Sequence, residues 1–406
     1  MEQLTERRVT STPRRAWVAA LLTATVGVAV GWFAPIQILL PAQSTALAGN
    51  DGKEALLALV VSFGAAASML ANPAWGALSD RLRARMGTRT PVLVAGAVVG
   101  MAGLVLLAVA GSPSVMVVGW VLTQAGLNGP FAVLAALIAD RVPEDRRGWV
   151  GSLFGVAQLV GTVVGTILAT VTGEGMIGYI AVMIAVPLLL LPVLLTRPGS
   201  PPVNVESSPA AGRATGGWRI SRTFAAAFAL RLLLNLVSAL GVLYLYFFLS
   251  DRAHVDDPGT SVLVLTVCYV MIAGLAAAGG GVLSDRRGRR RPVVVVAAVA
   301  LSLGSVMMAF STSMPFIVAA IVVLGVGYGA FLAVDVAIIT DALPDARTRG
   351  TMLGVANIGS TLPQVLAPVV AAPVVTSAAG YTGLYLAAAV VALLALAVIP
   401  LLRGIR

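Results

Sequence analysis

The stretch "GVLSDRRGRRRP", residues 281–292, sets a dense group of charges between two apolar runs. Five arginines follow a single aspartate, whereas the segments on either side, "SVLVLTVCYVMIAGLAAAGG" and "VVVVAAVALSLGSVMMAF", carry no charge. A near-copy, "GALSDRLRARMGTRTP", occupies residues 76–91 and also lies between apolar runs. The chain therefore contains the same kind of basic loop twice, once in each half.

The composition places the chain in a membrane. Hydrophobic residues make up 58% of the sequence and charged residues only 11%, against about 25% charged in an average soluble protein. So much apolar surface requires lipid as a solvent. The single cysteine, Cys268, and the single histidine, His254, exclude a disulfide framework and predict that no metal or cofactor is bound.

Apolar runs long enough to cross a bilayer recur along the whole chain. A helix needs about 20 apolar residues to span about 30 Å of hydrocarbon. The sequence predicts an all-α membrane protein with twelve such helices, near residues 17–40, 55–78, 91–110, 115–138, 149–172, 176–195, 223–249, 261–283, 292–311, 314–339, 351–376 and 384–402.

The basic residues predict how these helices are oriented. Of 27 lysines and arginines, 24 fall in the N-terminal segment, in every second loop and at the C-terminal end. Lys53 and Arg252 lie on the opposite side, and Arg231 lies inside a helix. The positive-inside rule then predicts a multi-pass protein of the bacterial cytoplasmic (inner) membrane with both termini in the cytoplasm. A nucleic-acid partner is excluded, because the arginines are dispersed over seven separate segments.

Two halves of the chain resemble each other. "LFGVAQLVGT" (153–162) aligns with "MLGVANIGST" (352–361), and "GALSDR" (76–81) aligns with "GVLSDR" (281–286). The offset of about 200 residues spans six helices, so both halves insert in the same orientation. We expect an N-terminal six-helix bundle at 1–196, a cytoplasmic linker at 197–222 that is rich in Pro, Gly and Ser, and a C-terminal bundle at 223–406. Such parallel six-helix pseudo-repeats are one plan of secondary transporters, with the substrate at the interface between the halves.

The twelve helices, the parallel halves and the G-x-L-S-D-R-x-x-G-R-R-R loop resemble the major facilitator superfamily. Within it, "NPAWGALSDRLRARMGTRTP" (72–91), "VDVAIITDALPD" (334–345) and "NIGSTLPQVLAP" (357–368) are similar to bacterial relatives of the sucrose–proton and glycoside–cation symporters. The resemblance implies a secondary transporter that works by alternating access and imports a sugar or glycoside-like polar solute with a proton.

The resemblance also implies that the basic loops form a cytoplasmic gate. Their aspartates, Asp80 and Asp285, would face helix starts of the opposite half, near Gly350 and Gly148, where the helix dipole favours an anion. The alternative is that these loops only fix the orientation in the membrane. The predicted gate residues are Asp80, Arg81, Asp140, Asp285, Arg286, Arg290 and Asp341.

Two ionisable residues lie well inside predicted helices. Arg231 falls in the seventh helix and Asp335 in the tenth, and ionisable groups at such depth are costly and usually functional. We expect them to pair, to contact the substrate, and Asp335 to exchange the coupling proton. The alternative is a purely structural ion pair.

Amide side chains at helical spacing form the rest of the predicted substrate site. An amide both donates and accepts hydrogen bonds, which suits a ligand rich in hydroxyl groups, although the same residues also serve as contacts between helices. Besides Arg231 and Asp335, the predicted substrate-binding residues are Gln37, Gln124, Asn128, Gln158, Asn235, Asn357 and Gln364.

The sequence gives weaker support to other functions. Proton-coupled drug exporters usually have an arginine in the fourth helix, where this chain reads "GWVLTQAGLNGP" (119–130). An exporter of a drug or secondary metabolite therefore remains as the alternative, with a non-transporting membrane sensor more remote. An enzyme would need converging ionisable residues at a membrane face, and none is predicted. The expected partners are a small-molecule substrate and membrane lipid, and the chain is expected to act as a monomer.

Overall fold

The computed structural model describes residues 15–196, 221–287, 289–342 and 349–402, and it is all-α, as the sequence predicts. All but the last two positions of the predicted linker at 197–222 lie outside the described residues. The first half contains α1 (Arg15–Ala34), the π-helical turn η1 (Pro35–Leu39), α2 (Leu40–Met86), α3 (Thr90–Ala108), α4 (Pro113–Arg141), α5 (Glu144–Thr172) and α6 (Met176–Leu195). The second half contains α7 (Arg222–Leu243), α8 (Leu245–Asp251), α9 (Pro258–Arg287), α10 (Arg291–Phe310), α11 (Met314–Asp341), α12 (Arg349–Val375), α13 (Gly380–Val398) and the short 3-10 turn η2 (Ile399–Leu401).

Eleven helical stretches of the described residues are long and apolar enough to cross a membrane. The first, Arg15–Met86, has 72 residues, or about 108 Å at 1.5 Å per residue, and so contains two crossings. They meet at Gly49, whose φ of 66° and ψ of −175° break the helix and suit a residue without Cβ. The residues between the predicted spans 17–40 and 55–78 are helical on both sides of Gly49.

Local sequence signals set several helix ends. Ser112 and Ser221 cap α4 and α7 by accepting hydrogen bonds from Val115 N and Phe224 N, as short polar side chains do at an N-cap. Gly87 ends α2 in the left-handed conformation, with φ at 69°. The predicted seventh span, 223–249, is interrupted at Tyr244, which separates α7 from α8.

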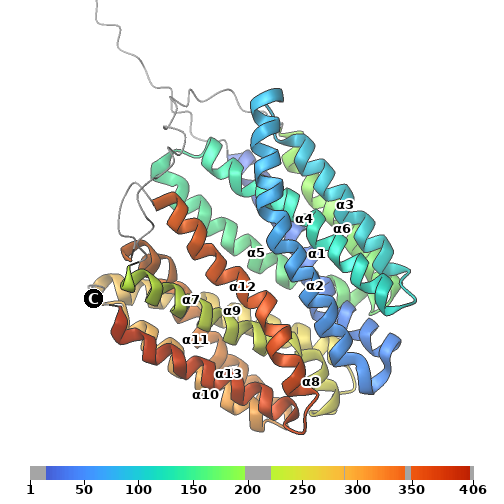
Figure 1. The fold of residues 1–406 in the computed structure, drawn as a ribbon, viewed down its shortest axis with the longest axis vertical. Helices are drawn as coiled ribbons and strands as arrows, with labels where there is room; N and C mark the ends of the chain where they lie inside the picture. Colours follow the sequence, from blue (N-terminus) through green and yellow to red (C-terminus); the bar gives the residue numbers. More distant parts are fainter. Residues whose placement is uncertain (1–14, 197–220, 288, 343–348, 403–406) are drawn as a thin grey trace, which may run out of the picture.

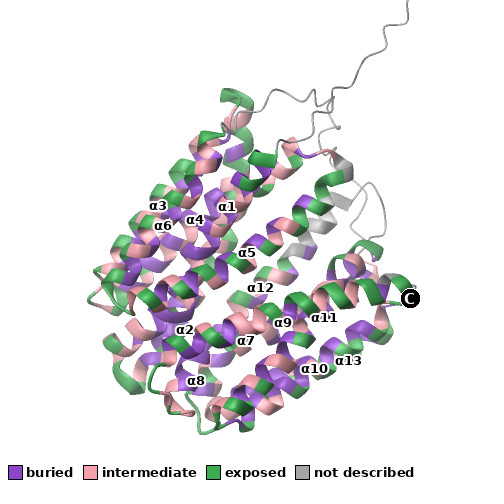
Figure 2. Cartoon of the chain, turned by 180° about the vertical axis from the view of Figure 1, so that it is seen from behind, coloured by how far each residue is buried: buried purple, intermediate pink, exposed green. Residues whose placement is uncertain are grey.

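Small residues let neighbouring helices approach closely. A Cβ on Gly126 of α4 would lie 2.1 Å from the backbone nitrogen of Gly100 in α3. In the second half, a Cβ on Gly329 of α11 would lie 2.2 Å from the carbonyl oxygen of Ala273 in α9. Large apolar side chains on α3, α6, α10 and α13 are instead exposed, as a surface facing lipid requires. Figure 2 shows the exposed residues along the outer faces of the bundle.

The two halves pack against each other through matching helices. In the repeat, α2 corresponds to α9 and α5 to α12, and the interface pairs α2 with α12 and α5 with α9. We call the end that carries Arg83, Arg89 and Arg290 the arginine end, and the end that carries Tyr246 and Tyr381 the tyrosine end. Figure 1 shows the halves converging at the tyrosine end, near α8, and drawing apart toward the arginine end.

Candidate functional site

A cavity of about 210 Å³ lies between the two halves and takes its wall from both. The first half contributes α1, η1, α2 and α5, and the second half contributes α7 to α12. Most of the lining side chains are apolar. The polar ones are Gln37, Thr162, Ser238, Thr266, Tyr269, Tyr328 and Gln364.

Gln37 reaches this wall because the helix changes its winding there. Pro35 has no N–H to continue the α-helical ladder, and the chain forms a π turn in which Leu40 N donates to Pro35 O. The Gln37 side chain is buried. Its Oε1 lies 2.9 Å from the hydroxyl of Thr166 in α5 and 3.0 Å from that of Thr266 in α9. Gln37 therefore joins the two halves at the cavity.

Arg231 and Asp335 lie in contact, as the sequence predicted. Arg231 Nη2 on α7 is 3.3 Å from Asp335 Oδ2 on α11, and their side chains are only 14% and 8% exposed. Within the described residues, the Nε of Arg231 is buried without a hydrogen-bond partner. Neither residue lines the cavity wall, so the pair lies beside the cavity rather than in it.

A short series of contacts leads from this pair to the cavity. Asn235 Nδ2 donates to the backbone oxygen of Arg231, and Asn235 Oδ1 accepts from Tyr328 OH at 3.3 Å. The rings of Tyr328 and Tyr269 stack with centroids 5.9 Å apart, and the Tyr269 hydroxyl lies 3.0 Å from Ser238 Oγ. Asn235 thus holds a cavity tyrosine in place and is not itself among the lining residues.

Two predicted substrate residues of α4 lie elsewhere. The buried Asn128 donates to Ser68 Oγ and to the backbone oxygen of Gln124, and it accepts from Asn72 Nδ2. These contacts use nearly all of its hydrogen-bonding capacity within the first half. Gln124 packs against Gly64 of α2. Neither Gln124 nor Asn128 lines the cavity. Both residues connect α2 with α4 in this structure, as the packing alternative proposed.

The remaining amides divide between the interface helices. Gln364 of α12 lines the cavity. Gln158 of α5 is half-buried, and its backbone oxygen accepts from Thr162. The side chain of Asn357 lies outside what the structure describes. Of the amides predicted from the sequence, the structure brings Gln37 and Gln364 to the cavity wall.

At the arginine end, Asp140 of α4 holds two arginines of the first half. Arg83 Nη1 and Arg89 Nε both contact Asp140, the latter at 2.8 Å, and Arg89 also donates to Ser79 Oγ and to Asp80 Oδ1. Burial alone would lower the pKa of Arg89, but its hydrogen bonds to Asp140 and Asp80 outweigh this and raise the pKa. Arg290 pairs with Asp341 at the corresponding place in the second half.

The predicted contact of Asp80 near Gly350 falls on side chains outside the described part of the chain. Asp80 pairs with Arg89 of its own half, and its side chain is 71% exposed. This exposure agrees with the arrangement of the two halves, which converge at the tyrosine end and draw apart toward the arginine end (Figure 1). Arg81 and Arg286 are exposed, and the side chain of Asp285 lies outside the described part of the chain.

The tyrosine end contains a set of contacts between the halves that sequence reasoning missed. Lys53 Nζ on α2 lies 2.6 Å from Asp251 Oδ1 on α8, and the lysine side chain is only 4% exposed. The Tyr381 hydroxyl lies 2.8 Å from Asp251 Oδ2 and 2.9 Å from Glu54 Oε1. Tyr246 OH donates to Glu174 Oε1 at 2.7 Å. The only signal in the sequence was that Lys53 is the single lysine of the chain.

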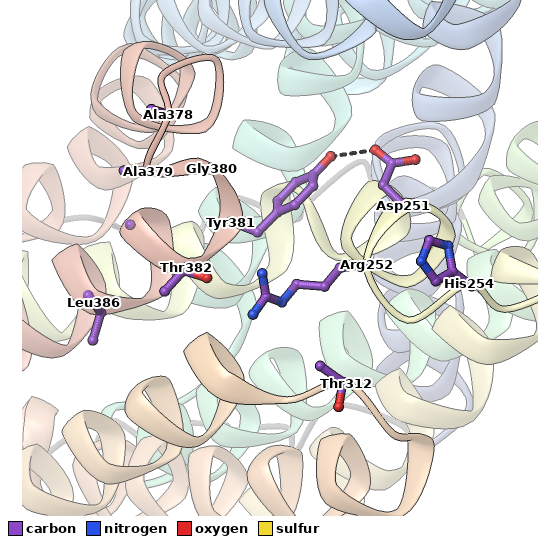
Figure 3. Close-up of a pocket in the computed structure, with 11 residues that line it drawn as sticks. Asp251, Arg252, His254, Thr312, Ala378, Ala379, Gly380, Tyr381, Thr382 and Leu386 are labelled. Carbon is purple, nitrogen blue, oxygen red and sulfur yellow. Dashed lines mark hydrogen bonds between the residues drawn. The ribbon is translucent and has the colours of Figure 1, made fainter.

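Figure 3 shows Tyr381 pointing toward Asp251 at the edge of an open surface hollow. Arg252, His254 and Thr312 line the same hollow. Asp251 therefore lines this hollow and also pairs with Lys53 of the first half.

Comparison with known proteins agrees with this architecture. The family model of the Major Facilitator Superfamily matches residues 17–282 and 254–406. No curated protein matches the chain. Similar solved structures include a peptide transporter POT in complex with sulfate, with 15% identity, a TM-score of 0.71, and coverage of 95% of this chain and 94% of that one.

Two further structures have the same fold. The nucleoside transporter NupG is 15% identical with a TM-score of 0.72, over 95% of this chain and 98% of its own. A bacterial homolog of the human lysosomal transporter Spinster, in an inward-facing and occupied conformation, is 14% identical with a TM-score of 0.73, over 96% of both chains. With twelve crossings in two six-helix repeats and a family model that matches nearly its whole length, this chain belongs to the Major Facilitator Superfamily of membrane transporters.

Proposed function

We propose that the chain imports a sugar or glycoside-like polar solute together with a proton, by alternating access across the bacterial cytoplasmic membrane. The observation that carries this proposal is the buried Arg231–Asp335 pair beside the cavity. Burying an ionisable pair at this depth costs free energy. A carboxylate that can take up and release a proton next to the cavity supplies what coupling requires.

The connection from the pair to the cavity supports the same proposal. Asn235 contacts the backbone of Arg231 and holds Tyr328, which lines the wall. Arg231 of the pair therefore lies one helical turn from the residue that holds a cavity tyrosine. Gln37 and Gln364 supply amides for polar groups of the solute.

The two ends of the molecule support the alternation. We assign the arginine end to the cytoplasm by the positive-inside rule. The contacts at the tyrosine end then close the outer side, and the basic loops with Asp80, Asp140 and Asp341 act as the gate of the inner side. The chain works as a monomer in this proposal, since each half supplies one wall of the cavity.

The Asp335→Asn substitution tests the coupling, because it removes the titrating group and keeps its size. Right-side-out vesicles with an imposed proton gradient should no longer accumulate the solute, whereas exchange of labelled against unlabelled solute should persist. Arg231→Ala should impair both processes. Accumulation against a gradient by the Asp335→Asn variant would reject Asp335 as the coupling site, and solute movement out of the cells would favour the exporter instead.

A further inference from the structure

The cavity wall carries no charge. Among the described residues that line it there is no Asp, Glu, Lys, Arg or His. The nearby Arg231 and Asp335 neutralise each other and lie outside the lining. An unpaired ion buried against such a wall would lose its hydration without compensation. The part of a solute that is seated here must therefore be uncharged.

Two stacked tyrosines line one side of the cavity. The rings of Tyr269 and Tyr328 stack with an interplanar angle of 21°, and both line the cavity. Ser238 and Asn235 hold the two hydroxyl groups, so the rings are fixed in orientation before a solute binds. Tyrosine offers a large contact area at a small cost in side-chain entropy, and the rings suit another ring with an apolar face.

The first half contributes apolar groups, one amide and the hydroxyl of Thr162 to the cavity wall. Phe33, Ile36, Val61 and Leu159 are the apolar members. Gln37 can make up to four hydrogen bonds, and the structure gives its side chain two partners. The amide therefore keeps capacity for one polar group of a solute, such as a glycosidic oxygen.

The size of the cavity limits what fits. Its volume of about 210 Å³ is below the about 300–1,000 Å³ that is usual for pockets that enclose a whole drug-sized ligand. A single ring fits within this volume. The hydroxyl-rich remainder of a larger solute must lie outside this cavity.

We propose that this cavity is the seat of one uncharged, largely apolar ring, and that the transported solute is a glycoside with an aromatic or similar ring aglycone rather than a free sugar. The proposal rests on the transport function proposed above and specifies the solute of the same site. The Tyr269–Tyr328 pair is its platform, and Gln37 contacts the polar group next to the ring.

The test is calorimetric binding to the purified protein with three glucosides that differ only in the aglycone. We expect 4-methylphenyl β-glucoside to bind at least about tenfold more tightly than methyl β-glucoside. We expect 4-carboxyphenyl β-glucoside, which has the same shape but a charged ring, to bind at least about a hundredfold more weakly than the methylphenyl compound. Equal affinities within either pair, or no binding of the methylphenyl compound, would overturn the proposal.

Substitutions of Tyr328 test where the ring of the aglycone binds. Tyr328→Leu should weaken binding of the methylphenyl glucoside about tenfold, and Tyr328→Phe, which keeps the ring, should stay within about threefold. Phe316→Leu is the matched control, because Phe316 lies on the same helix with an exposed side chain. Unchanged binding by Tyr328→Leu would contradict the proposed platform. Because binding is measured without a gradient, tight binding combined with failed accumulation would contradict the transport function and leave the ring seat standing.

Discussion

Lys53 Nζ lies 2.6 Å from Asp251 Oδ1, and this ion pair joins the first half of the transporter to the second. The lysine also lies over the ring of Phe247, 5.1 Å from its centroid, where the face of the ring attracts a cation. The lysine side chain is almost completely buried, so these partners contact its ammonium group in place of water. Opening the tyrosine end must separate Lys53 from Asp251, so the pair stabilises the conformation that is closed at this end.

Replacement of Lys53 by methionine should therefore favour opening at the tyrosine end, by about 1–3 kcal/mol. We would measure this with an impermeant maleimide and a Val61→Cys reporter in the cavity wall, after replacing the native Cys268 by alanine. Labelling from outside should become at least about fivefold faster. The control is Lys53→Arg, which keeps the charge. Unchanged labelling would mean that the pair does not hold this end closed.

Tyr381→Phe should have a smaller effect in the same assay. It removes the hydroxyl that lies between Glu54 and Asp251 but keeps the ring, which contacts Phe248 with centroids 6.0 Å apart. A single hydrogen bond contributes about 0.5–1.5 kcal/mol, and more when its partner is charged. The matched control is Tyr385→Phe, whose hydroxyl contacts Gly241 O in its own half. Equal effects of the two substitutions would argue against a specific contact between the halves.

The sequence predicted features that depend on local composition. Arg231 and Asp335 could be identified because a charge inside an apolar run is visible without a structure. The tyrosine end could not be identified in this way. Tyr381 and Glu54 are 327 positions apart, and a tyrosine in an apolar helix is equally compatible with packing. Their contact forms where the two halves pack together, so the sequence of either half by itself does not predict it.

The partners of the predicted gate residues could not be identified from the sequence. The repeat singled out charged positions in both halves, and in this structure Asp80 pairs with Arg89 of its own half. Asn128 shows that the spacing of polar residues along a helix does not decide what that face contacts. Its spacing from Gln124 suggested a common substrate face, and the same spacing places both residues against α2, where Ser68 and Asn72 use the hydrogen bonds of Asn128.

The repeat offers a matched pair of stability variants at the arginine end. Asp140→Asn removes the negative charge next to the buried Arg89, whereas Asp341→Asn affects a pair that is more exposed. The aspartate side chains are 10% and 42% exposed, respectively. We expect Asp140→Asn to lower the free energy of unfolding by about 3 kcal/mol and Asp341→Asn by no more than about 1 kcal/mol. Thermal unfolding in detergent measures both, and equal losses would contradict the difference in burial.

The orientation in the membrane can be tested with topology reporters. A reporter that requires the cytoplasm should be active when fused to either end of the chain and silent when inserted at Gly52, near the break at Gly49. The physical reason is the concentration of arginines at the opposite end of the helices. Activity at Gly52 would reverse the assignment of the arginine end to the cytoplasm.

The last prediction separates a structural Arg231–Asp335 pair from a functional one. Removing one member of a buried pair leaves the other charge without compensation and costs about 3–5 kcal/mol, whereas removing both can be nearly neutral. Asp335→Asn alone and Arg231→Gln alone should therefore lower the thermal stability, and the double variant should recover most of the loss. If the pair serves coupling, the double variant should be stable and still unable to accumulate solute against a gradient. If it recovers accumulation together with stability, the pair only holds α7 against α11, and the proton must be carried by another group.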